Sequence, residues 1–228
     1  MQRTKLNKSS IGRQRAQEVV AWKPVPWVLS SILLWLTTAT LFRPDAFAQQ
    51  PIAPVPLIPF GDGEYSVLTS PLRYQIGQSA FTITVPAGFV TDFASTPRAI
   101  WAILPPTGRY QLAAVVHDFL YWDQGCTRKQ ADDLLRAAMT ESLVSPVNRD
   151  IIYNAVRRFG EGAWNGNASA KAAEKPKIIP PERMNIPPLV TWPEYQAKLI
   201  AWGVKPSPKP TTPPGYCEAA GEVNPKLP

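Results

Sequence analysis

Proline is the residue that most constrains how this chain can fold. It occupies 26 of the 228 positions, and half of these prolines lie after residue 174. Proline lacks a backbone N–H donor and is disfavoured inside helices and sheets. The distribution therefore predicts a globular domain over residues 64–165, preceded by a proline-rich linker at 49–63. Residues 166–228 are expected to form a proline-rich tail that is mostly disordered.

The N-terminus has the composition of a targeting segment. Residues 1–48 carry seven Lys and Arg and two acids, a net charge of +5, whereas the remainder carries 17 basic and 15 acidic residues, a net of +2. The uncharged apolar run at 27–42 is 16 residues long, short for a bilayer span of about 20. It precedes Ala46-Phe47-Ala48, a small-x-small pattern that a signal peptidase could cut.

We interpret residues 1–48 as a signal peptide, with an uncleaved membrane anchor as the alternative that the positive-inside rule also allows. Either interpretation predicts that the rest of the chain is exported, to the periplasm or the outside of the cell, or anchored with its domain outside the cytoplasm. Membrane contact would then pass through this segment if it is uncleaved. Because the excess positive charge lies here and not on the globular part, no nucleic-acid partner is expected.

The two cysteines, Cys126 and Cys217, leave one question open. Export would permit a disulfide between them. Nothing in the sequence places Cys217, in the proline-rich tail, near Cys126. Their pairing is therefore undecided at this stage.

The middle of the chain combines short strands with helices. Apolar and polar residues alternate over 72–76 and 81–85, on either side of Gly77-Gln78-Ser79, which is a hairpin signal. Residues 110–122 are apolar nearly all round and predict a buried helix. A capping-box pattern at Thr127 and Gln130 opens a second helix.

A third helix is predicted to begin after Ser145, with Pro146 at its first position, and to stop at Gly160. The pair Arg157-Arg158 is expected to lie on a solvated face of this helix. A further short amphipathic helix is expected at 192–202. The predicted fold class is α+β: a small antiparallel sheet or set of hairpins followed by a three-helix core, with disordered flanks.

The single histidine lies on the first of these helices, in His117-Asp118-Phe119-Leu120-Tyr121. At helical spacing Tyr121 falls about 40° from His117 on the helix surface, so the two side chains share a face. On the next helix, Asp132 lies beside the apolar stripe, whereas Asp133 is expected to face water. We expect Asp132 to accept the imidazole N–H, which would fix the tautomer and raise the basicity of the ring.

A second polar cluster contains Asp92, Ser95 and Arg98. It could line the same cleft as His117 and bind substrate, with Arg98 holding an anionic group such as phosphate by a bidentate contact. The alternative is a local turn in which Asp92 and Ser95 bond nearby backbone amides.

Four separated motifs occur in order between Phe89 and Trp164: Val90-Thr91-Asp92-Phe93-Ala94-Ser95-Thr96-Pro97-Arg98, His117-Asp118-Phe119-Leu120-Tyr121, Ala131-Asp132-Asp133 and Tyr153-Asn154-Ala155-Val156-Arg157. Through these motifs the region resembles a bacterial and phage family known only as domain of unknown function 1353. With the strands before it, the resemblance covers about half the chain, and the family name implies no activity.

The His-Asp-x-x-Tyr pattern, with an aspartate on the following helix, is also similar to the catalytic helices of phospholipases A2. This resemblance implies that His117 is a catalytic base that activates water, that Asp118 is a calcium ligand, and that Tyr121 and Asp132 form the supporting network. Calcium would polarise the ester carbonyl. Residues 104–109 depart from the secreted enzymes, because they contain one glycine and no cysteine where those enzymes have a glycine- and cysteine-rich calcium loop.

Two functional hypotheses follow. The first is a hydrolase, calcium-dependent if Asp118 binds the ion, that acts on a lipid or cell-envelope ester with His117 as its base. The alternative is a non-catalytic envelope or phage-derived structural module, in which the same His, Asp and Tyr side chains form a buried polar network.

Overall fold

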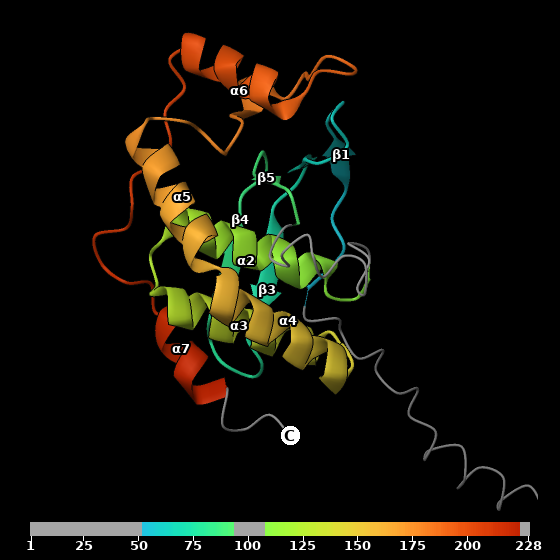
Figure 1. Ribbon diagram of the computed structural model, residues 1–228, viewed down its shortest axis with the longest axis vertical. Coiled ribbons are helices and arrows are strands. Elements are labelled where there is room, and N and C mark those ends of the chain that lie inside the picture. The colour runs from blue at the N-terminus through green and yellow to red at the C-terminus, as the bar shows by residue number, and fades with distance from the viewer. Residues whose placement is uncertain (1–51, 94–107, 224–228) are drawn as a thin grey trace, which may run out of the picture. The chain divides into compact units, whose positions relative to one another are not determined.

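The computed structural model describes residues 52–93 and 108–223, apart from the side chains of 221–223, and has the predicted α+β fold (Figure 1). Short strands come first and helices follow. The strands are β1 (Leu57–Pro59), β2 (Ser66–Leu68), β3 (Leu72–Gln75), β4 (Thr82–Val85) and β5 (Val90–Thr91). The helices are α2 (Gln111–Asp123), α3 (Arg128–Glu141), α4 (Pro146–Phe159), α5 (Glu161–Ala172), the 3₁₀ turn η2 (Pro181–Arg183), α6 (Trp192–Ala201) and α7 (Tyr216–Val223).

The strands form two small antiparallel sheets. β3 and β4 make the predicted hairpin, with Leu72 opposite Val85 and Tyr74 opposite Ile83, and these four side chains are buried. The alternation of buried and exposed residues along both strands explains the period of two in the sequence. β1, β2 and β5 form the other sheet, in that order.

The three predicted core helices are confirmed, and local sequence explains where they begin. Thr127 and Gln130 form a reciprocal capping box at the start of α3. Ser145 accepts a hydrogen bond from the backbone of Asn148 at the start of α4, with Pro146 in the first turn. α2 is buried on most sides, and it packs against α3 and one face of the β3–β4 hairpin.

The C-terminal part of the chain corrects our expectation of disorder. Helix α6, which coincides with the short helix expected at 192–202, closes a second apolar core over the β1–β2–β5 sheet. The buried members of this core are Phe60, Val67, Val90, Ile179, Val190, Trp192, Tyr195 and Leu199. Proline-rich segments connect the helices here without becoming disordered, because their apolar side chains have a sheet to pack against.

Backbone contacts fix this C-terminal part to the sheet. Val90 donates to the carbonyl of Lys177 at 2.9 Å, and Ile179 donates to the carbonyl of Gly88 at 2.8 Å. Gly88 has φ +80°, and a Cβ at this position would lie 2.0 Å from the carbonyl oxygen of Ile179. The described part of the expected linker, residues 52–63, is structured as well, since it contains β1 and the buried Ile52, which bridges to Tyr74.

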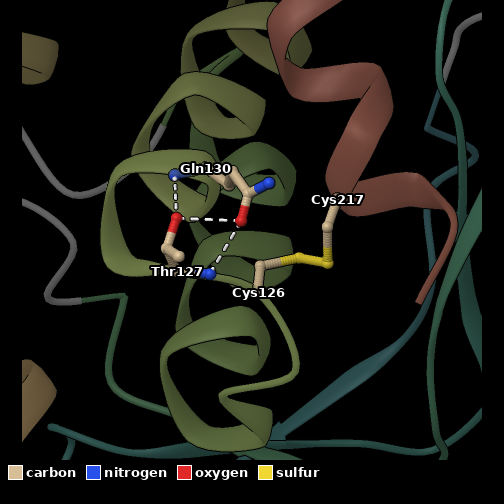
Figure 2. The surroundings of a disulfide bond; sticks show 4 residues. All are labelled: Cys126, Thr127, Gln130 and Cys217. Atoms are coloured by element: carbon tan, nitrogen blue, oxygen red, sulfur yellow. Dashed lines mark hydrogen bonds between the residues drawn. A yellow bond between two sulfur atoms is a disulfide. The ribbon is translucent and has the colours of Figure 1, made fainter. Parts of the chain in front are cut away.

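A disulfide between Cys126 and Cys217 settles the pairing that the sequence left open. It joins the start of α3 to α7, and Figure 2 shows it beside the Thr127 capping box. Helix α7 lies along α3, and its Ala219 and Ala220 are buried in the main core (Figure 1). The last part of the chain is therefore covalently attached to the helical core.

The apolar run at 27–42 lies outside the described residues. Within residues 52–93 and 108–223, no helix is both long enough and apolar enough to cross a membrane.

We predict that removing the disulfide destabilises the domain without changing its fold. The bond closes a loop with a sequence separation of 91 residues, and cross-links of this kind typically contribute about 2–4 kcal/mol. Replacing both cysteines by serine should lower the free energy of unfolding, measured by urea denaturation, by an amount in this range. Equal stability of the double variant and the unreduced wild type would contradict the structure.

Candidate functional site

The Asp132 carboxylate is the centre of a buried polar network. Its Oδ1 lies 2.9 Å from Nε2 of His117 and accepts a hydrogen bond from the Tyr121 hydroxyl at 2.6 Å. The rings of His117 and Tyr121 are one helical turn apart on α2, and their centroids lie 4.1 Å apart. Asp132 thus forms hydrogen bonds with both side chains of the shared α2 face, as their helical spacing suggested.

Two arginines bind the other carboxylate oxygen. Oδ2 of Asp132 lies 2.7 Å from Arg157 Nη1 and 3.4 Å from Arg128 Nη1. Burial alone would raise the pKa of Asp132, but hydrogen bonds from His117, Tyr121 and Arg157 together hold that pKa below its usual value. The carboxylate is therefore ionised at neutral pH.

An ionised carboxylate determines the tautomer of the histidine. Because Asp132 can only accept hydrogen bonds, Nε2 of His117 must carry the proton that it donates. In the neutral ring the basic lone pair is then on Nδ1. The arrangement is the one that orients a general base and stabilises the imidazolium that forms when the base takes a proton.

Two neighbouring side chains differ from expectation. Asp133 does not face water: it is 4% exposed, accepts a hydrogen bond from Tyr153 at 2.7 Å and pairs with Lys129 at 2.6 Å. Helix α4 covers the side of α3 that helical periodicity alone leaves open. Arg157, expected on a solvated helix face, turns instead toward Asp132.

Asp118 has a separate environment on the same helix. Its Oδ2 accepts a hydrogen bond from the Thr91 hydroxyl at 2.5 Å. Burial and the nearby charge of Asp92 raise the pKa of Asp118 to about 6, against the opposing effects of Lys177, Thr91 and His117. A neutral Asp118 is thus accessible in mildly acidic solution.

His117, Asp118, Tyr121 and Asp92 line a cleft of about 490 Å³. Helices α4 and α5 form its apolar side, and residues of the C-terminal part complete it. His117 is only 1% exposed, so its ring lies below the surface among the residues that line the cleft. A cleft of this size accommodates an organic ligand.

Of the three residues expected to bind substrate, Asp92 lines this cleft, whereas Ser95 and Arg98 lie outside the described residues. The expected metal ligand, Asp118, also lies in the cleft. In the part of the chain that the structure describes, no three His, Cys, Asp or Glu side chains are grouped so as to hold a metal ion.

Several contributors to the site were missed at the level of sequence. Arg128 lies four residues before Asp132, a spacing that signals an ion pair on one helix. Thr91 directly precedes Asp92 within a motif that was already identified. Gly160 was interpreted only as a helix stop, yet a Cβ there would lie 2.5 Å from the Tyr121 hydroxyl. No sequence signal points to Lys177, which reaches the site through a long-range contact.

Part of the chain is similar to a known protein family. Residues 66–156 match the model of a family described as "Protein of unknown function (DUF1353)". A search of the curated proteins and a search of the solved structures found no match. The family match supports the resemblance seen in the ordered motifs, and it covers the strands β2 to β5 and most of the His117–Asp132 network. The local similarity to phospholipases A2 receives no support from these comparisons.

We predict that Gly160→Ala disturbs the network while Gly162→Ala does not. The new methyl group at 160 would lie 2.5 Å from both the Tyr121 hydroxyl and the backbone oxygen of Val156, so it would displace the hydroxyl from Asp132 and strain the end of α4, at a cost of about 1 kcal/mol or more. Among the residues that the structure describes, no atom of another part of the chain lies within 4 Å of a Cβ at 162, and alanine should favour helix α5 there. Urea denaturation should show that the first variant is less stable than wild type and that the second is at least as stable.

We also predict a pH dependence that belongs to Asp118. A carboxyl group whose pKa is higher in the folded than in the unfolded state stabilises the fold when protonated, so this contribution declines as the pH rises from about 4 to about 6. Asp118→Asn keeps an acceptor for Thr91 but cannot titrate. The unfolding free energy of wild type minus that of the variant should therefore fall over this interval and then level off. A constant difference would show that Asp118 titrates normally.

Proposed function

We propose that this protein is a hydrolase in which His117 acts as general base toward water in the cleft. The observation that carries the proposal is the Asp132–His117 pair at 2.9 Å, with Asp132 held ionised by arginine and the imidazole at the wall of a cleft. A buried polar network that served stability alone would not need to border a space for a ligand.

In the proposed reaction Nδ1 of His117 removes a proton from water as the water oxygen attacks an ester carbonyl. Asp132 stabilises the resulting imidazolium through the Nε2–H hydrogen bond, and Tyr121 and Arg157 hold the carboxylate in position. The imidazolium then returns its proton to the departing alkoxide. No step depends on calcium, and the role of Asp118 as a calcium ligand stays a prediction from the similarity to phospholipases A2.

Export of the chain is part of the proposal. It is supported by the basic and apolar N-terminal sequence and by the Cys126–Cys217 bond, because disulfides persist mainly in oxidising compartments. A cell-envelope or lipid ester is the substrate class that fits this location.

The alternative is a non-catalytic envelope or phage-derived module. Its support is the burial of the network, since Asp132 is 0% and His117 1% exposed. A buried charge with well-placed partners can be retained for a unique fold without any chemistry.

We predict that the full-length protein releases fatty acid from mixed phospholipid vesicles and that His117→Gln abolishes release. Asp132→Asn should reduce the rate by 100-fold or more, on the order of the contribution of a positioned general base. Parallel reactions with millimolar calcium or with a chelator would show whether the rate depends on calcium, as it should if Asp118 binds this ion.

Arg158→Gln is the matched control, because Arg158 is next to Arg157 in sequence but packs on the Phe159 ring and does not itself line the cleft. It should retain wild-type rates. Absence of release by wild type under every condition, together with unfolding of His117→Gln, would favour the structural module instead.

A further inference from the structure

The chain beyond the matched family domain forms one wall of the cleft. The family match ends at residue 156, and the residues that follow contribute Lys175, Lys177, Trp192 and Gln196 to the lining. Residues after the family match would therefore determine which ligand groups this wall can bind.

This wall is held in a defined position. The Lys177–Ile179 segment is bonded to β5 and Gly88, and Trp192 donates its backbone N–H to Asp62 at 2.7 Å. Gln196 donates to the carbonyl of Pro176 at 2.9 Å, which ties α6 to the lysine-bearing segment. The backbone at Gly61 also lies close to this part of the chain, since a Cβ at 61 would be 2.1 Å from the carbonyl oxygen of Leu189. The wall is thus preorganised for a ligand.

The charge of the wall is positive. Lys175 is exposed and Lys177 is half-buried, with its ammonium 5.7 Å from the centre of the Phe89 ring. Neither ammonium forms an ion pair within 4 Å among the residues that the structure places. Lys177 also interacts electrostatically with Asp118, and both ammonium groups line the cleft, where an anionic group on a ligand could contact them.

The opposite side of the cleft is mainly apolar. Val156 and Phe159 of α4, with Ala163 and Ala170 of α5, present hydrocarbon to the cleft. Phe159 is 61% exposed, unusually high for a large aromatic side chain. An apolar body could bury this surface while its charged group contacts the lysines.

We propose that the cleft binds an anionic amphiphile, with Lys175 and Lys177 contacting its carboxylate or phosphate and the α4–α5 side contacting its hydrocarbon. This deepens the proposed function by naming the substrate class, and it rests on the same cleft. Asp92 and Asp118 also line the cleft, so the proposal places the anionic group at the lysines and not beside these carboxylates.

Binding can be tested without any catalysis. Isothermal titration of the full-length protein would use octanoate, octyl phosphate and octyltrimethylammonium below their micellar concentrations, three probes with the same tail. At least one of the two anions should bind, and the cation at least tenfold more weakly. Whichever of octanoate and octyl phosphate binds more tightly would indicate whether the cleft prefers a carboxylate or a phosphate.

Lys177→Gln should weaken binding of the preferred anion at least fivefold, whereas Lys198→Gln, an exposed lysine of α6 that does not line the cleft, should leave it unchanged. Equal binding of anion and cation, no binding of either anion, or no effect of Lys177→Gln in a variant with wild-type melting temperature would overturn the proposal. If the protein binds the anion but hydrolyses no ester, the cleft is an anion-binding site and the proposed hydrolysis is wrong.

Discussion

The buried carboxylate of Asp132 is the constraint on which the rest of the structure depends. An isolated charge in an apolar interior is strongly unfavourable, so it must be matched by donors. Here the donors come from three helices: His117 and Tyr121 from α2, Arg128 from α3 itself, and Arg157 from α4. Satisfying one carboxylate therefore fixes the relative position of α2, α3 and α4, and the same contacts orient the imidazole toward the cleft.

The second determinant is how the C-terminal part closes the cleft. A family domain that ended at residue 156 would leave the sheet edge at β5 and one side of the cleft uncovered. Residues 175–179 pair with that edge, α6 covers the β1–β2–β5 sheet, and the disulfide attaches α7 to α3. Glycine at 61 and 88 permits the close backbone approaches. The positive wall of the cleft thus depends on long-range contacts rather than on the local sequence around His117.

Local signals in the sequence were sufficient for much of this fold. The period of two identified the β3–β4 hairpin, and the caps at Thr127 and Ser145 identified α3 and α4, because both depend on neighbouring residues. Helical spacing also brought Tyr121 and Asp132 to His117. It failed for Asp133 and Arg157, whose environment is set by packing of α4 against α3. The order of the proline-rich tail was missed for the same reason, since proline content says nothing about a distant sheet edge or a cysteine partner.

Ionised Asp132 holds the His117 imidazole with its proton on Nε2, and the ring nitrogens themselves can test this. Since the chain has one histidine, ¹⁵N-labelled imidazole would give one pair of ring nitrogen resonances, assignable without mutation. At a pH where the ring is neutral, we expect an Nε2–H tautomer. Its proton should be protected from exchange with water and should show a through-space correlation to Asp132. A proton on Nδ1, or rapid exchange between the two tautomers, would contradict it.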